Sequence, residues 1–115
     1  MPTISRGDVL LTLFPFTDLS GSTLRPCLVV SPGLIGQDLI VAGISSVVRS
    51  GVIATDVVVE ASHPEFLQTG LRVRSVIRLH KLAAIEQTVI SRRLGRIGPQ
   101  LQAEVDQRLK VALGL

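Results

Sequence analysis

Short runs of apolar residues, several of them alternating with polar ones, predict a domain built mainly of β-strands. Glycine, proline, serine and aspartate separate the runs, and these residues favour turns. The first run bends near the proline of "FPF", and the second ends at "SPG". The pattern predicts five strands, at residues 9–16, 25–31, 38–48, 55–61 and 74–80.

The last third of the chain has a different pattern. Residues 83–97 fit either a strand or a helix. Beyond Gly98, apolar residues recur at every fourth position, which is typical of a helix with one buried face. Pro99 suits the first turn of this helix and Gly114 suits its end. We therefore expect a strongly bent sheet or small barrel with one C-terminal helix. The apolar positions of the helix are Leu101, Val105, Leu109 and Leu113.

The size and composition of the chain fit a single aliphatic domain over residues 1–115. Hydrophobic residues make up 46% of the chain but aromatic residues only 3%, so the core should consist of leucine, valine and isoleucine. No apolar run approaches the ~20 residues that span a membrane. The opening "MPTISRGD" turns polar before a signal peptide could form. We therefore expect a cytoplasmic protein that makes no contact with membranes.

The residues that most often bind metals or carry out catalysis are sparse. The single cysteine excludes an internal disulfide and a cysteine-based zinc cluster. Cys27 lies within an apolar strand, where an inert core thiol is expected. His63 and His80 have no evident partner, and the common motifs for metal, nucleophile or phosphate chemistry do not occur. No metal or other cofactor is therefore expected.

Arginine dominates the basic residues: ten of the twelve are arginine, and the net charge is +3. A planar guanidinium suits bidentate contact with phosphate, so the surface favours an anionic partner, either nucleic acid or an acidic peptide. Arg72, Arg74 and Arg78 alternate along the chain and are predicted to share one face of a strand. A second cluster consists of Arg92, Arg93 and Arg96.

The stretch "GSTLRPCLVVS" places a lone arginine at the mouth of a buried strand. Pro26 can open such a strand but cannot donate to its ladder, so Arg25 is held at the strand entrance. There Arg25 either presents a cation to a partner or only solvates the strand end.

A pair of serines offers hydroxyl groups within an otherwise apolar strand. Ser45 and Ser46 point to opposite faces, so at most one of them serves a given site; at a sheet edge, they would only bond to backbone or water. Arginine and a hydroxyl together suit the cleavage of RNA. Fixed donors stabilise the charge of a phosphodiester transition state, and the ribose 2′-hydroxyl supplies the nucleophile.

Nearly the whole chain resembles the MazF/PemK toxin family. The resemblance is carried in order by "RGDVLLTLFPFTDLSGSTLRPCLVVS", "LIVAGISSVV" and "GLRVRSVIRLHKLAAIEQTVISRRLGRIG". It implies an SH3-like small β-barrel of the CcdB/PemK type with a C-terminal helix, and a homodimer. It also implies metal-independent, sequence-specific cleavage of single-stranded mRNA to 2′,3′-cyclic phosphate and 5′-hydroxyl ends, which inhibits translation and growth. The implied partner is a cognate antitoxin with an acidic C-terminal segment.

The resemblance also assigns roles to residues. The arginine of the family's "RP" matches Arg25, which would stabilise the pentavalent phosphate and assist the departing 5′-oxygen. The family's hydroxyl residue, more often threonine, matches Ser45, which would hold a phosphate oxygen or the attacking hydroxyl. Some members carry a carboxylate in the loop before the arginine, where this chain has serines and where Asp18 is the nearest acid. The expected RNA-binding residues are Asp18, Ser20, Ser22, Ser46, Arg72, Arg74, Ser75 and Arg78.

A non-catalytic function is the alternative to an enzyme. The same chain could be an SH3-like nucleic-acid-binding module or the subunit of an autorepressor. The presence of both Arg25 and a hydroxyl at position 45 favours the enzyme, whereas similarity of fold alone would not.

Overall fold

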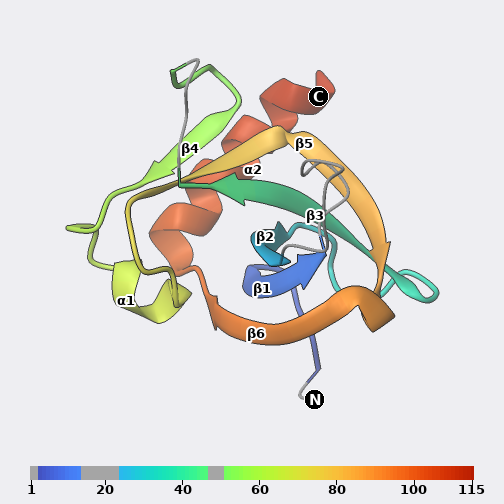
Figure 1. Cartoon of the computed structure of the whole chain (residues 1–115). Coiled ribbons are helices and arrows are strands. Elements are labelled where there is room, and N and C mark those ends of the chain that lie inside the picture. Colours follow the sequence, from blue (N-terminus) through green and yellow to red (C-terminus); the bar gives the residue numbers. More distant parts are fainter. Residues whose placement is uncertain (1–2, 14–23, 47–50) are drawn as a thin grey trace.

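The computed structural model describes residues 3–13, 24–46 and 51–115. In these ranges the chain forms six strands, two helices and one short 3-10 turn (Figure 1). The first four strands are β1 (Asp8–Leu13), β2 (Leu24–Val29), β3 (Asp38–Ser45) and β4 (Asp56–Val59). They are followed by α1 (Phe66–Thr69), β5 (Ser75–Glu86), the 3-10 turn (Gln87–Val89), β6 (Ile90–Arg96) and α2 (Pro99–Leu113).

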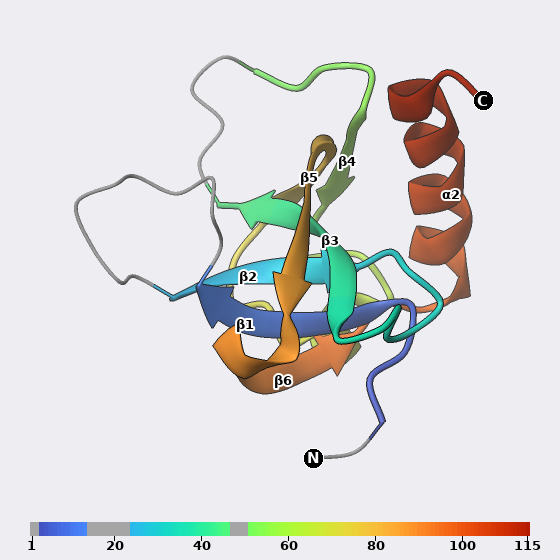
Figure 2. The same cartoon turned by 90° about the vertical axis from the view of Figure 1, so that its right-hand side faces the viewer.

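The six strands form one antiparallel sheet in the order β4-β5-β3-β2-β1-β6. The sheet is strongly curved, and α2 packs beside β4 and β5 (Figure 2). The prediction of a mainly β fold with a C-terminal helix is confirmed. The sheet is not closed into a barrel, because β4 and β6 remain at its two edges.

Each face of the sheet buries its own aliphatic cluster. On the face toward α2, Val9 lies opposite Leu28 and Leu28 opposite Ala42, and all three are fully buried. Leu101 and Val105 of α2 complete this cluster. Leu109 only borders it and Leu113 is 53% exposed, so the predicted apolar stripe of the helix is buried over its first half alone.

The opposite face carries the second cluster. Leu10 lies opposite Cys27, and Val29 lies opposite Val41, with no exposed surface on any of the four. Burial raises the pKa of the Cys27 thiol to about 12, so the thiol stays protonated at neutral pH. A protonated, inaccessible thiol is unreactive, as the sequence predicts.

The stretch at residues 83–97 that fitted two readings is neither a helix nor one strand. β5 continues through Glu86, the chain turns at Gln87–Val89, and β6 follows. The pairing of β5 with β3 shifts register between Ala42 and Gly43, which interrupts the regular alternation of buried and exposed positions. Within the stretch itself, the pairing of β6 with β1 shifts register twice and the burial of β6 does not alternate, which explains why the apolar pattern did not reveal a strand there.

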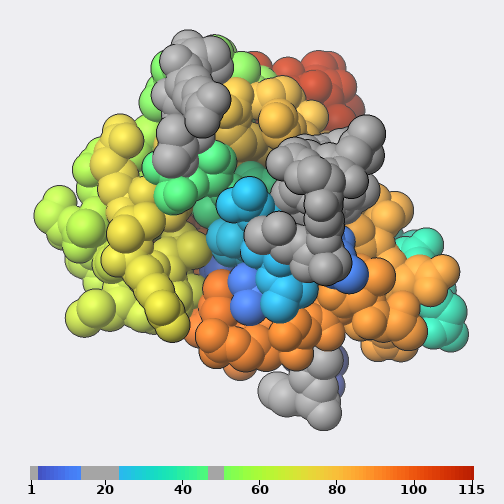
Figure 3. Space-filling model, in the orientation of Figure 1, coloured from blue at the N-terminus to red at the C-terminus, as the bar shows by residue number. Residues whose placement is uncertain are grey.

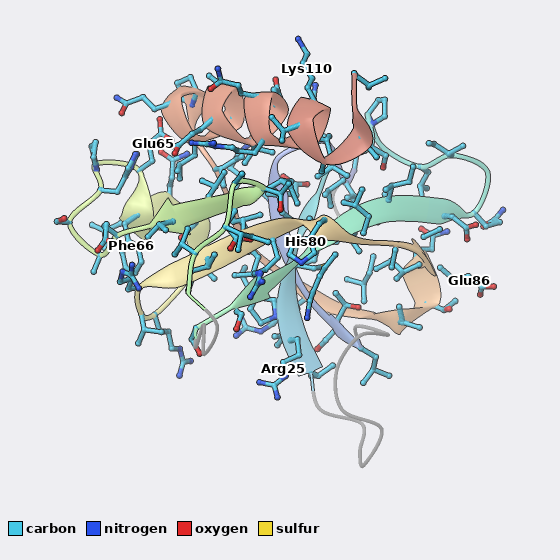
Figure 4. The ribbon with its side chains drawn as sticks, turned by 90° about the horizontal axis from the view of Figure 1, so that it is seen from above. Arg25, Glu65, Phe66, His80, Glu86 and Lys110 are labelled. Carbon is cyan, nitrogen blue, oxygen red and sulfur yellow. The ribbon has the colours of Figure 1, made fainter. Side chains whose placement is uncertain are left out.

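A buried carboxylate from the α1 region caps α2. Glu65 is 6% exposed, and its two carboxylate oxygens accept hydrogen bonds from the backbone N–H groups of Gln100 (2.8 Å) and Leu101 (2.9 Å). Figure 4 shows Glu65 beside the start of α2. A Cβ atom at Gly98 would lie 2.4 Å from the Glu65 carboxyl carbon, so this close approach requires glycine. Helix N-termini leave such N–H groups unpaired and favour negative charge.

Replacing Glu65 by alanine is expected to lower the free energy of unfolding by about 1–2 kcal/mol, because two N–H groups lose their acceptor. Urea unfolding followed by circular dichroism measures this change. Glu104→Ala is the matched control, since Glu104 lies on α2 without a hydrogen-bond partner in the described part of the chain. Equal stability of the two variants would contradict the capping role.

Candidate active site

The register of the central strands aligns Arg25 with Ser45. β2 and β3 pair Cys27 with Gly43 and Val29 with Val41. The ladder ends at Cys27 and Gly43; continued two residues toward the start of β2, the same antiparallel register would bring Arg25 opposite Ser45. Residues directly opposite one another in antiparallel strands share a face and have neighbouring side chains. Arg25 is exposed and Ser45 is half-buried, so the pair lies where one end of the sheet meets solvent.

Figure 4 shows Arg25 at the end of β2 that is far from α2. Its guanidinium has no hydrogen bond or ion pair in the described ranges, 3–13, 24–46 and 51–115. Ser45 is the last residue of β3, and the exposed Ser46 follows the strand. Since neighbouring strand residues point to opposite faces, the register favours Ser45 over Ser46 as the hydroxyl beside Arg25.

The prediction that Arg72, Arg74 and Arg78 share one face of a strand is wrong. β5 begins at Ser75, so the first two of these arginines precede the strand. Alternation of residue types misled the assignment because the backbone is not extended as a strand there. The exposed Arg72 makes no ion pair within the described residues, whereas the other two are engaged.

Arg74 and Arg78 are held by carboxylates that flank or belong to β4. The Nε of Arg74 donates to Glu60 Oε1 at 2.7 Å, and both side chains are 53% exposed. The Nε of Arg78 lies 3.1 Å from Asp56 Oδ1, with side-chain exposures of 13% and 0%. Arg78 therefore neutralises a buried carboxylate and is a poor candidate for contacting a phosphate.

The two histidines take part in local structure. The Nδ1 of His80 lies 3.1 Å from Thr55 Oγ1 and 3.9 Å from Asp56 Oδ1. The Nδ1 of His63 accepts a hydrogen bond from the backbone N–H of Glu65 at 3.0 Å. Figure 4 shows His80 on β5, away from the end of β2 that carries Arg25. Neither histidine is placed as a base for the Arg25–Ser45 pair.

The remaining expected RNA-binding residues have different surroundings. Ser75 is 3% exposed, and its hydroxyl donates to the backbone carbonyl of Val73 at 2.8 Å. An RNA contact by Ser75 would require this bond to rearrange. Asp18, Ser20 and Ser22 lie outside the described residues.

Thr12 of β1 lies next to Arg25 in the sheet, on the side away from β3, and the sequence pattern did not single it out. It pairs directly with Arg25 in the register of β1 and β2. Thr12 has no exposed surface, and its Oγ1 has no hydrogen-bond partner in the described parts of the chain. Within "DVLLTL" it resembles any core position of a strand, so only the structure distinguishes it.

The second arginine cluster lines a surface pocket at the edge of the sheet. Arg92, Arg93 and Arg96 of β6 and Gln68 of α1 surround a volume of about 550 Å³. The Nε of Arg93 lies 3.3 Å from the buried carboxylate of Asp8, whereas the other two arginines form no ion pair within the described residues. Figure 3 shows the surface of β6 directly below those of β1 and β2. Arg92 and Arg96 therefore leave uncompensated positive charge at this edge of the sheet.

Two further features of the described residues bear on chemistry. They contain no group of three or more histidine, cysteine, aspartate or glutamate side chains that could hold a metal ion. Among them, no helix is both long and apolar enough to cross a membrane.

Comparison with protein families decides the identity of the chain. Residues 5–113 match the family model described as PemK-like, MazF-like toxin of type II toxin–antitoxin systems. The chain belongs to this toxin family. The match covers both Arg25 and Ser45 and confirms the resemblance found in the sequence. No curated protein sequence matches the toxin.

Solved structures of MazF proteins share the fold of this toxin. An endoribonuclease from a mycobacterial species, solved with its cognate antitoxin, is 21% identical, with a TM-score of 0.73 over 97% of this chain and 96% of that chain. The Mycobacterium tuberculosis toxin MazF-mt6 is 23% identical, with a TM-score of 0.69 over 96% and 98% of the two chains. MazF from Deinococcus radiodurans is 18% identical, with a TM-score of 0.73 over the full length of both.

Proposed function

We propose that this toxin is an endoribonuclease that cuts single-stranded mRNA in the cytoplasm, without a metal ion, and thereby inhibits translation and growth. The observation that carries the proposal is the register of β2 and β3, which pairs Cys27 with Gly43 and, when continued two residues, brings Arg25 opposite Ser45. The family assignment supports it, as does the similarity to a mycobacterial protein described as an endoribonuclease.

The proposed reaction is an internal transesterification of RNA. The ribose 2′-oxygen attacks the adjacent phosphorus and loses its proton, while the bond from phosphorus to the 5′-oxygen breaks and that oxygen gains a proton. The products are a 2′,3′-cyclic phosphate and a 5′-hydroxyl. Arg25 donates hydrogen bonds to the non-bridging oxygens as negative charge accumulates, and it also assists the departing 5′-oxygen. Because arginine stays protonated in proteins, Arg25 does not act as the base.

Ser45 supplies a second fixed donor in this proposal. Its hydroxyl holds either a phosphate oxygen or the attacking 2′-hydroxyl in line with the breaking bond. Threonine at this position keeps the hydroxyl, so Ser45→Thr should remain active while Ser45→Ala is slow. A larger loss of cleavage rate in Ser46→Ala than in Ser45→Ala would show that Ser46, and not Ser45, lies beside Arg25.

The arginine-rich surface suits a polyanionic partner. Arg25 and Arg72 are uncompensated by any carboxylate of the described residues, as are Arg92 and Arg96 at the β6 edge. RNA phosphates would bind such a surface, and the proposed cognate antitoxin would compete for it through an acidic C-terminal segment.

The toxin itself is proposed to act as a homodimer. Exposed apolar residues at the end of α2, Val111, Leu113 and Leu115, are consistent with a protein contact.

Incubation of the purified toxin with a long single-stranded RNA in excess EDTA tests the proposal. We expect discrete fragments whose 5′ ends map to a shared short sequence, and no fragments with Arg25→Ala. RNA that is bound but left intact by the wild-type toxin would instead identify a non-catalytic nucleic-acid-binding module or autorepressor subunit. Cleavage that disappears on adding EDTA would contradict the metal-independent reaction.

A further inference from the structure

Within the described part of the chain, the hydroxyl of Thr12 is a polar group buried without a hydrogen-bond partner. Thr12 has no exposed surface, and its Oγ1 has no hydrogen bond within the described residues. Buried polar side-chain atoms are nearly always hydrogen-bonded. Leaving one unsatisfied lowers the stability of the fold.

The fold does not require a hydroxyl at this position. Thr12 lies between Arg25 of β2 and Ile90 of β6 in the sheet register, and Leu10 precedes it on the same face. Leu10 and Ile90 belong to or border the aliphatic cluster of this face. Valine has the same branched shape as threonine and would fill the same space without a buried hydroxyl. The threonine therefore carries a penalty that packing does not explain.

Arg25 is the residue best placed to satisfy this hydroxyl. Opposite residues of an antiparallel pair have Cβ atoms about 4.5–5.5 Å apart, which is within reach of an arginine side chain. Ile90, the other neighbour of Thr12, has no side-chain donor. A guanidinium carries five N–H donors, and those of Arg25 are not engaged by the described residues.

We propose that Thr12 is a positioning residue that orients Arg25 for cleavage. With a phosphate bound, Arg25 lies across β1, and its Nε–H donates to Thr12 Oγ1. The two terminal nitrogens then face the phosphate oxygens as a fixed fork. This inference rests on the proposed function, because it assigns Thr12 a part in the same reaction. The orientation of the guanidinium matters most when negative charge develops on the phosphate in the transition state. Loss of the Thr12 hydroxyl should therefore lower kcat and leave KM nearly unchanged.

The test compares Thr12→Val with Thr12→Ser in the full-length toxin, using RNA cleavage kinetics and urea unfolding. A hydrogen bond to a charged group contributes about 1.5–3 kcal/mol, so Thr12→Val should lower kcat roughly 10- to 100-fold. KM should change less than about twofold, and the urea midpoint should stay equal or rise because an unsatisfied hydroxyl is removed. Thr12→Ser keeps the hydroxyl and should retain most of the activity.

Thr69→Val is the matched control. Thr69 is also fully buried, but its hydroxyl donates to the Phe66 carbonyl at 2.6 Å and accepts from the Leu71 N–H at 3.1 Å. This variant should lose stability and keep its kcat. If Thr12→Val behaves in the same way, the positioning role is overturned and Thr12 is merely structural.

A double-mutant cycle with Arg25→Ala separates this inference from the proposed function. Adding Thr12→Val to Arg25→Ala should cause no further loss of rate, because Thr12 acts through Arg25. Additive losses would overturn the coupling while leaving the endoribonuclease assignment intact. Equal rates for wild-type toxin and Thr12→Val would do the same. Absence of cleavage by the wild-type toxin would overturn the proposed function, and the role of Thr12 with it.

Discussion

Replacing Arg25 by alanine is expected to slow RNA cleavage about 100- to 1,000-fold, the usual effect of removing one preorganised donor from a developing negative charge. The fold should be unaffected, since the Arg25 side chain is exposed and its guanidinium makes no hydrogen bond or ion pair with a described residue. Single-turnover cleavage of a defined RNA gives the rate, and urea unfolding gives the stability. A rate within a few-fold of the wild-type toxin would remove Arg25 from the chemistry.

Two further variants make the Arg25 result specific. Arg25→Lys keeps the positive charge but loses the planar fork, so it should also be inactive. Arg6→Ala removes another surface arginine, which pairs with Asp106 on α2, and it should cleave at the wild-type rate. Full activity of Arg25→Lys would mean that charge alone is needed and that the fork geometry is irrelevant.

Replacing Arg78 by alanine is expected to destabilise the toxin by about 3–5 kcal/mol, because it leaves a buried charge without its partner. The carboxylate of Asp56 has no exposed surface and lies 3.1 Å from the Arg78 Nε. Urea unfolding measures the loss. Arg78→Lys retains a cation beside Asp56 and should lose less, so the effect remains measurable if the alanine variant does not fold.

Arg74 and Arg72 provide controls for the Arg78 prediction. The Arg74–Glu60 pair is half exposed, and Arg74→Ala should change stability by less than about 1 kcal/mol. Arg72→Ala should leave stability unchanged but weaken RNA binding and flatten its dependence on salt, if Arg72 contacts a phosphate. A stable Arg78→Ala variant that instead shows this salt effect would restore Arg78 to the RNA surface.

Much of the fold could be predicted from the chain because its signals are local. Strand residues alternate between faces and helical residues recur at every third or fourth position, so the first five strands and α2 follow from short stretches, whereas β6 did not. Turn residues mark their ends. The position of Arg25 at the entrance of β2 follows from the neighbouring proline in the same way. The resemblance of "RP" and of the serine-containing strand to the family's motifs then assigned Arg25 and Ser45 to one site.

The features that escaped prediction depend on residues far apart in the sequence. Glu65 caps a helix by bonding Gln100, 35 residues later in the chain, and no local pattern marks such a bond. The partners of Arg74 and Arg78 come from the β4 region, so alternation alone could not show that these cations are neutralised. Thr12 looks like any core position until the register sets it opposite Arg25.

The most direct test of the account is cleavage of an RNA with a single 2′-deoxy nucleotide on the 5′ side of the mapped cleavage site. We expect the wild-type toxin to cut the all-ribose RNA in EDTA to a 2′,3′-cyclic phosphate and a 5′-hydroxyl. We expect no cut at the deoxy position, because the attacking hydroxyl is missing. Cleavage at the deoxy position, or products ending in a 5′-phosphate, would contradict the account, because water rather than the RNA would then supply the nucleophile.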